Sequence, residues 1–146
     1  MLRGNSLAKI DEKGRLKLPA AFRSVIEPAF GDEFFVTSLR GESARIYPMP
    51  VYAELEAKML AASSVQPLVA KLRNGFNYFG QRSVMDPQGR ILLHPLLREK
   101  AELAGEVAVL GQQNFLEVWN RGAFEEALLR QPLTDDDLRE LAGLGF

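Results

Sequence analysis

The chain has 146 residues, of which 47% are hydrophobic and 25% charged, and its net charge is -1. These values are typical of a globular protein with one domain or two small modules. The absence of cysteine excludes disulfides, thiolate catalysis and cysteine-based zinc sites. No apolar run approaches the roughly 20 residues of a membrane span, and residues 1–6 lack the apolar segment of a signal peptide. We therefore expect a cytoplasmic protein without a membrane partner.

Charge is distributed unevenly along the chain. Residues 1–25 carry six cations and two carboxylates, whereas residues 117–142 carry three cations and seven carboxylates. A basic segment of this kind favours an anionic partner. Chance segregation of charge is the alternative interpretation, and composition alone does not decide between the two.

The first elements in chain order form a hairpin followed by a short helix. Residues 7–11 and 15–18 alternate apolar and polar side chains, which predicts two strands joined by a three-residue loop. Gly14 ends the loop, because glycine adopts a left-handed backbone without steric cost. Pro19 then ends the strand, and residues 20–26 favour a short helix.

The same order returns about half a chain further on. Residues 83–86 and 90–93 predict a second hairpin, in which Pro87 presets the turn and Gly89 closes it. A helix is expected from Pro95 to about residue 103. Both copies share the frame D-x-x-G-R, two apolar-leaning positions, Leu, and then Arg five places on. A repeat of this kind predicts a duplicated architecture.

Each hairpin is followed by two strands and a helix. The expected strands cover residues 34–37, 44–48, 106–110 and 115–119, and the expected helices cover residues 51–62 and 122–130. Between the copies, residues 67–72 favour a helix, and Asn74-Gly75 is a strong turn signal. The sequence thus predicts an α+β fold of two tandem pseudo-symmetric modules, with hairpins and short helices around a small β-barrel-like core.

The expected boundaries follow from this order of elements. Residues 1–62 form the first module, residues 63–80 a helical connector, and residues 81–146 the second module with its C-terminal helices.

Catalysis finds little support in the sequence. His94 is the single histidine and lies in an apolar strand end, where a structural role is usual. No glycine-rich phosphate loop is present. A hydrolase would need Asp11 and Asp86 close together as a carboxylate pair. Each aspartate is instead followed at i+4 by an arginine, which favours two local ion pairs. We expect no catalytic residue, no metal, no cofactor and no small-molecule substrate.

Nucleic-acid binding is better supported by the first turn. Lys13 and Arg15 flank the loop glycine, and Lys17 lies on the same strand face as Arg15. A two-stranded ribbon fits the major groove of B-DNA, where arginine recognises guanine O6 and N7. Asp11 would hold Arg15 in one rotamer. The alternative is that these arginines serve only the fold.

The second turn keeps the geometry with less charge. Gln88 stands where the first turn has lysine; glutamine can recognise adenine, but it releases no counterions. We expect Asp86 and Gly89 to orient this turn as Asp11 and Gly14 orient the first. Arg90 either contacts DNA or supports an interface.

Several motifs together resemble the MraZ family. They are Arg3-Gly4-Asn5, Asp11 to Leu16 with Pro19 and Phe22-Arg23, Asp86 to Ile91, and Gly111 to Trp119. The resemblance covers residues 1 to about 130. In that family a proline follows the second motif's apolar run, whereas this chain has His94 before Pro95, which predicts a shift of about one residue in the helix start.

The resemblance implies a bacterial transcriptional regulator with two AbrB-like swapped-hairpin modules per chain. It implies a homo-oligomeric ring, octamer- or dodecamer-like, that binds short direct repeats in double-stranded DNA upstream of the division and cell-wall gene cluster, its own gene included. The protein would repress these genes and associate with the nucleoid in the cytoplasm. The expected DNA-binding residues are Arg3, Lys13, Arg15, Lys17, Gln88 and Arg90. The alternative is a ring-forming scaffold whose D-x-x-x-R loops are subunit contacts.

Overall fold

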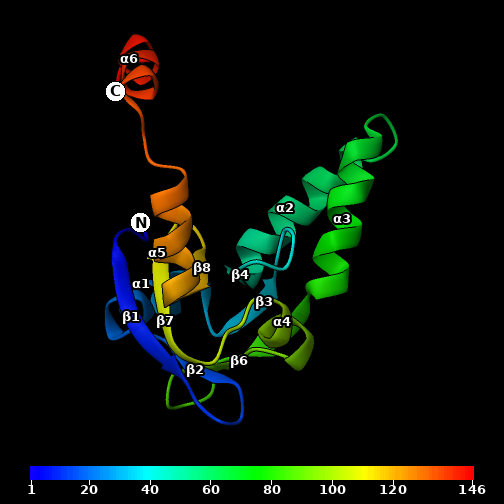
Figure 1. The fold of residues 1–146 in the computed structure, drawn as a ribbon. Helices are drawn as coiled ribbons and strands as arrows, with labels where there is room; N and C mark the ends of the chain where they lie inside the picture. Colours follow the sequence, from blue (N-terminus) through cyan, green and yellow to red (C-terminus); the bar gives the residue numbers. More distant parts are fainter.

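Eight antiparallel strands and six helices make up the protein (Figure 1), as described by a computed structural model of all 146 residues. The strands are β1 (Asn5–Ile10), β2 (Arg15–Lys17), β3 (Glu33–Thr37), β4 (Ala44–Pro48), β5 (Gln81–Val84), β6 (Arg90–Leu92), β7 (Gly105–Gly111) and β8 (Leu116–Asn120). The helices are α1 (Ala20–Phe30), α2 (Met49–Ala62), α3 (Pro67–Phe79), α4 (Pro95–Lys100), α5 (Arg121–Arg130) and α6 (Asp135–Gly143). The α+β class and the barrel-like sheet expected from the sequence are confirmed.

The two copies of the repeat interleave within one sheet. Its strand order is β5-β3-β4-β8-β7-β1-β2-β6, so pairs of neighbouring strands from one half lie between strands of the other half. The pairs β1–β7 and β3–β5 are equivalent under exchange of the two copies, and the pairs β2–β6 and β4–β8 each join a strand to its own counterpart. Neither hairpin therefore folds onto its own module alone. The boundaries expected at residues 62 and 81 stay a prediction.

One hydrophobic core unites both halves. It contains 20 buried residues that come from strands and helices of each copy. Leu16 of β2 and Ile91 of β6 face each other across the sheet, and neither is exposed to solvent. Because side chains alternate along a strand, burial of these two turns their neighbours on β2 and β6 outward. The core thereby fixes which residues this part of the sheet presents to solvent.

The α2–α3 hairpin extends from the sheet and contains a second, smaller core (Figure 1). The turn expected at Asn74-Gly75 is wrong, because α3 continues through both residues to Phe79. Phe76 is buried against Tyr47 and Tyr52, with ring centroids 6.1 and 6.2 Å apart. The hydroxyl of Thr37 donates to the Phe76 carbonyl at 2.6 Å. This packing outweighs the local preference of Asn-Gly for a turn.

Helices α1 and α4 end at different residues from those that the sequence predicts. α1 continues to Phe30 and contains Pro28, whereas α4 already ends at Lys100. Glu102 then has a left-handed backbone with φ of 54°, and this conformation stops the helix before Leu103, which is buried in the core. No helix is long and apolar enough to cross a membrane.

Candidate nucleic-acid interface

The two repeat turns have the same backbone hydrogen bonds. In the first, one carboxylate oxygen of Asp11 accepts from the backbone N–H of Lys13 at 3.0 Å and of Arg15 at 2.9 Å. In the second, Asp86 accepts from Gln88 and Arg90, each at 2.9 Å. An aspartate that caps its own turn in this way fixes the backbone locally. The expected role of both aspartates in orienting the motif rests on these contacts.

The second carboxylate oxygen of each aspartate holds an arginine. Arg15 Nε donates to Asp11 Oδ2 at 2.8 Å, and Arg90 Nε donates to Asp86 Oδ2 at 2.7 Å. The two ion pairs predicted from the i+4 spacing are confirmed. Each pair uses only Nε, so the two terminal nitrogens of each guanidinium make no hydrogen bond within the chain. A guanidinium held in this way is oriented and still able to donate two bonds to a ligand.

Both aspartates are stabilised as carboxylates. The backbone N–H of Arg15 is the largest influence that lowers the pKa of Asp11, and the guanidinium of the same residue adds to it against the opposing effect of desolvation. The corresponding groups of Arg90 lower the pKa of Asp86. A general-acid carboxyl needs a raised pKa. Neither aspartate is therefore suited to serve as the acid of a hydrolytic pair.

The outer face of β2–β6 is basic. Arg15 and Lys17 of β2 stand opposite Leu92 and Arg90 of β6, respectively, and all four side chains point away from the buried Leu16–Ile91 pair. We call these four outward residues the basic ribbon. Like charges directly opposite in a sheet are unfavourable, so Lys17 and Arg90 repel each other, and the Asp86 carboxylate bound to Arg90 offsets part of this repulsion. A bound anion between the two cations would remove that repulsion.

Each turn is also held by the other copy. The carbonyl of Gly14 accepts from the Leu93 N–H at 2.9 Å, and that of Gly89 accepts from the Leu18 N–H at 2.8 Å. The two turns consequently emerge from the same end of the molecule, at the bottom of Figure 1. Lys13 and Gln88 are exposed at their tips. The structure thus brings together five of the six residues that the sequence predicts to bind DNA.

Two arginines complete this exchange between the copies. A Cβ added to Gly14 would lie 2.4 Å from the guanidinium carbon of Arg98, and one added to Gly89 would lie 2.8 Å from Arg23 Nη1. Both glycines also have a left-handed backbone, with φ of 82° and 80°. Arg23 Nη2 further donates to the Pro87 carbonyl at 3.2 Å. The sequence marks both arginines as repeated positions, but not as supports of the opposite turn.

Arg3 lies apart from the other five residues. It precedes β1, whereas the first turn follows β1, and a strand of this length spans roughly 20 Å. Its neighbour Leu2 instead forms a bridge with Gln113 at the opposite end of the strand. The structure therefore does not add Arg3 to the cationic surface at the turns.

His94 has a structural contact. Its Nε2 lies 2.5 Å from the carbonyl oxygen of Phe79, and the residue is buried at the start of α4. Pro19 occupies the equivalent place before α1, and the helices begin five residues after Arg15 and Arg90, respectively. The two copies thus begin their helices at the same distance from the motif arginine, and the shift expected at His94 relative to the family stays a prediction.

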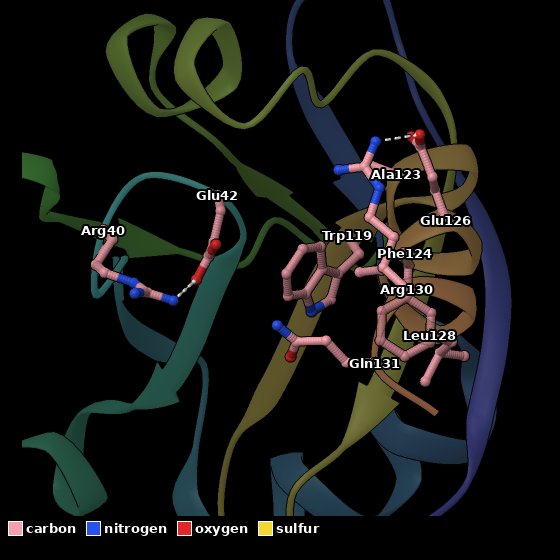
Figure 2. Close-up of a pocket in the computed structure, with 10 residues that line it drawn as sticks. Arg40, Glu42, Trp119, Ala123, Phe124, Glu126, Leu128, Arg130 and Gln131 are labelled. Atoms are coloured by element: carbon pink, nitrogen blue, oxygen red, sulfur yellow. Dashed lines mark hydrogen bonds and ion pairs between the residues drawn. The ribbon is translucent and has the colours of Figure 1, made fainter. Parts of the chain in front are cut away.

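Away from the turns, the surface between α5 and the β3–β4 connection is hollowed. This space has a volume of about 530 Å³, and the ring centroids of Trp119 and Phe124, which line it, lie 5.5 Å apart. Figure 2 shows the residues that surround it. The nearby Arg40 pairs with Glu42. None of the turn residues lines the hollow. The protein contains no group of three or more carboxylate or histidine side chains that could hold a metal ion.

The fold and the turns together define an α+β protein built on two repeats whose strands pair with each other across one sheet. Residues 81–141 match the family model described as "MraZ protein, putative antitoxin-like". The proteins named transcriptional regulator MraZ from Acidobacterium capsulatum and Koribacter versatilis are 43% and 45% identical to this chain, over the full length of both chains in each case. The protein of the same name from Syntrophobacter fumaroxidans is 34% identical, over 84% of this chain and 81% of the length of that protein. The chain therefore belongs to the MraZ family, which confirms the resemblance inferred from the motifs.

Proposed function

We propose that this protein regulates transcription by binding double-stranded DNA in a sequence-specific manner, with the two turns and the basic ribbon as its DNA-binding surface. The relatives' name, transcriptional regulator, supports the functional class. The observation that carries the proposal is the paired orientation of Arg15 and Arg90, whose terminal nitrogens are free while Nε is bound to an aspartate. Arginine presented in this way can donate two bonds to guanine or to a phosphate.

The shape and charge of the surface agree with this role. A two-stranded ribbon is narrow enough for the major groove of B-DNA. Lys17 and Arg90 stand side by side, and Lys13 extends the positive charge to the tip of the first turn. DNA phosphates would relieve the repulsion between the two ribbon cations. Gln88 would contact a base edge or a sugar-phosphate oxygen without adding charge.

We further propose that several copies act together. The net charge of -1 is low for a DNA-binding protein, and one ribbon offers few phosphate contacts. A homo-oligomeric ring, octamer- or dodecamer-like, would engage short direct repeats at the same time and raise the effective concentration of each further contact. We propose repression of the division and cell-wall gene cluster, including the protein's own gene, by a cytoplasmic, nucleoid-associated assembly.

Binding to the DNA upstream of its own gene tests the proposal. We expect tight binding, measured by fluorescence anisotropy, to duplexes with intact repeats and much weaker binding to scrambled ones. The affinity should fall steeply between about 50 and 200 mM salt, because phosphate contacts release counterions. Equal affinity for intact and scrambled repeats would exclude sequence-specific binding, and a flat salt response would exclude phosphate contacts.

The second candidate is a ring-forming scaffold in which the D-x-x-x-R loops contact neighbouring subunits. The free guanidinium nitrogens of Arg15 and Arg90 would suit a carboxylate of a neighbour as well as DNA. Gel filtration of Arg15→Ala separates the two functions. A regulator keeps its assembly and loses DNA binding, whereas a scaffold of this kind dissociates. Arg130→Ala is the matched control, because it removes an exposed arginine outside the turns.

A further inference from the structure

The C-terminal helix α6 is well formed but packs on nothing in its own chain. Thr134 and Asp137 form a reciprocal capping box, with bonds of 3.0 and 3.1 Å, and three aspartates occupy the first turn. No residue of α6 is buried. Figure 1 shows it separated from the sheet by an extended segment. A helix of nine residues is marginal in water unless an apolar face is packed.

That apolar face is present and unoccupied. Leu138 and Leu141 are three residues apart, and Leu144 follows after a further three, so that they share one side of the helix. Leu138 is 51% exposed and Leu144 is 71% exposed. The same segment carries four carboxylates and one arginine. It is therefore an amphipathic acidic helix, and a surface that is apolar and basic would complement it.

The protein offers such a surface on α3 and the β3–β4 connection. Leu39, Leu68 and Leu72 line an open groove of about 580 Å³, together with Val69. Leu68 is 72% exposed and Leu39 is 40% exposed. The charged groups at this groove are Arg40 and Lys71, and α3 contains Lys71 and Arg73 but no carboxylate. Because Arg40 is paired with Glu42, Lys71 supplies the free positive charge at the edge of this otherwise apolar groove.

We propose that α6 of one copy docks into the α3 groove of a second copy. The leucines would enter the groove while the aspartates and Glu140 face Lys71 and its neighbours. This is the helix-in-groove mode, with charge complementarity at the rim. The inference rests on the proposed self-association and not on DNA binding.

The contact is head-to-tail, because α6 and the groove are different surfaces of the chain. Contacts of this type form closed rings when the rotation between copies closes, and filaments when it does not. Each copy gives one helix and accepts another. This contact gives the acidic C-terminal segment a partner distinct from the basic ribbon.

A complementation experiment tests the contact in the full-length protein without DNA. Leu138→Asp removes the docking helix face, and Leu68→Asp removes the groove. Each variant should run as a single chain in light scattering, whereas the unaltered protein assembles. Leu129→Asp, on an exposed leucine of α5, is the control and should leave the assembly mass unchanged. Circular dichroism establishes that all three variants are folded.

Mixing the two variants gives the decisive measurement. The intact helix of Leu68→Asp should dock on the intact groove of Leu138→Asp, so an equimolar mixture should contain two-chain complexes and no larger ones. A mixture that stays monomeric, unchanged masses of both variants, or a monomeric unaltered protein would each overturn the proposal. DNA binding measured in parallel on a single site reports the proposed function separately.

Cross-linking distinguishes a second copy from the same copy. The chain has no cysteine, so Lys71→Cys with Glu140→Cys introduces a single pair of thiols. Under mild oxidation we expect a ladder of two-chain and larger products on a denaturing gel. A product that contains only one chain, or no disulfide at all, would contradict docking between copies.

Discussion

The turns at residues 11–15 and 86–90 have nearly the same geometry and different tips. Both have an aspartate that accepts two backbone N–H groups and one arginine Nε, and both have a glycine with a left-handed backbone. At the tips, the first turn has Lys13 where the second has Gln88. On the strands that follow, the first copy has Lys17 at the position that Leu92 occupies in the second. The frame residues determine the shape of each turn, whereas the remaining positions are free to determine its charge. The two halves can therefore share an architecture and differ in binding.

Removal of the oriented arginines should have the largest effect. Arg15→Ala and Arg90→Ala each delete a group able to make two bonds to guanine, and we expect a loss of about 1–3 kcal/mol, on the order of 5- to 150-fold in affinity. The loss from Arg15→Ala should be larger, because Lys13 gives its turn additional phosphate contact. Anisotropy with intact operator repeats measures both variants.

The number of repeats sharpens this comparison. Arg15→Ala should lose more affinity for an operator with several repeats than for a single repeat, because linked contacts multiply its effect. Equal losses on both DNAs would argue against simultaneous binding by several copies. A smaller loss from Arg15→Ala than from Arg90→Ala would assign the principal role to the second turn.

The glycines should be the most sensitive positions for stability. Gly14→Ala and Gly89→Ala each force a side chain into a left-handed backbone, at about 1–2 kcal/mol. Gly14→Ala should destabilise more, because its Cβ would meet Arg98 at 2.4 Å, against 2.8 Å between a Cβ on Gly89 and Arg23. Urea unfolding measures the difference. Combining Gly14→Ala with Arg98→Ala should recover part of the loss, and no recovery would show that Arg98 adjusts freely.

A single substitution at either tip should remove the charge difference between the turns. Lys13→Gln should weaken binding uniformly across DNA sequences and reduce the salt slope by about one, which is roughly threefold in affinity between about 50 and 200 mM salt. Gln88→Lys should strengthen binding by a similar factor if the second turn also faces the DNA. An unchanged salt slope for Gln88→Lys would place that tip away from the phosphates.

Substitution of Lys17 on β2 should change stability and DNA binding in opposite directions. Lys17→Leu gives β2 the residue that β6 carries at the equivalent position and removes the repulsion from Arg90. We expect the free energy of unfolding to rise by about 0.2–1 kcal/mol while DNA affinity falls. Thermal unfolding and anisotropy on the same sample check both effects. A fall in stability would mean that Lys17 serves the fold.

Acid should affect both turns alike and weakly. The pKa of Asp11 and of Asp86 lies below the ordinary 3.8 in the folded chain. Their contribution to stability is therefore fully present above pH 3.8 and is lost as the pH falls through the lowered values. The melting temperature should decline less on acidification in Asp11→Asn with Asp86→Asn than in the unaltered protein. Parallel declines would show that other carboxylates dominate.

The sequence by itself determined the turns. Aspartate, glycine and arginine act on one another within five residues, so the ion pairs of Arg15 and Arg90 and the two turns could be predicted from spacing. The second hairpin could not, because β5 pairs with β3 and β6 pairs with β2. The family could be inferred for the same reason, since its motifs are local. Alternating side chains also predicted most strands, because the period of a strand is visible without knowledge of its partners.

Only the tertiary structure decided how the copies combine. Arg23 bonds to Pro87, 64 residues away, and no local pattern reveals such a contact. The pairing of β2 with β6 creates the basic ribbon, and the direction of β1 separates Arg3 from it. Likewise α3 continues through Asn74-Gly75 because Phe76 packs against aromatic rings from other elements. In each case contacts between residues distant in sequence outweigh or complete the local preference, because burial of side chains depends on the whole fold.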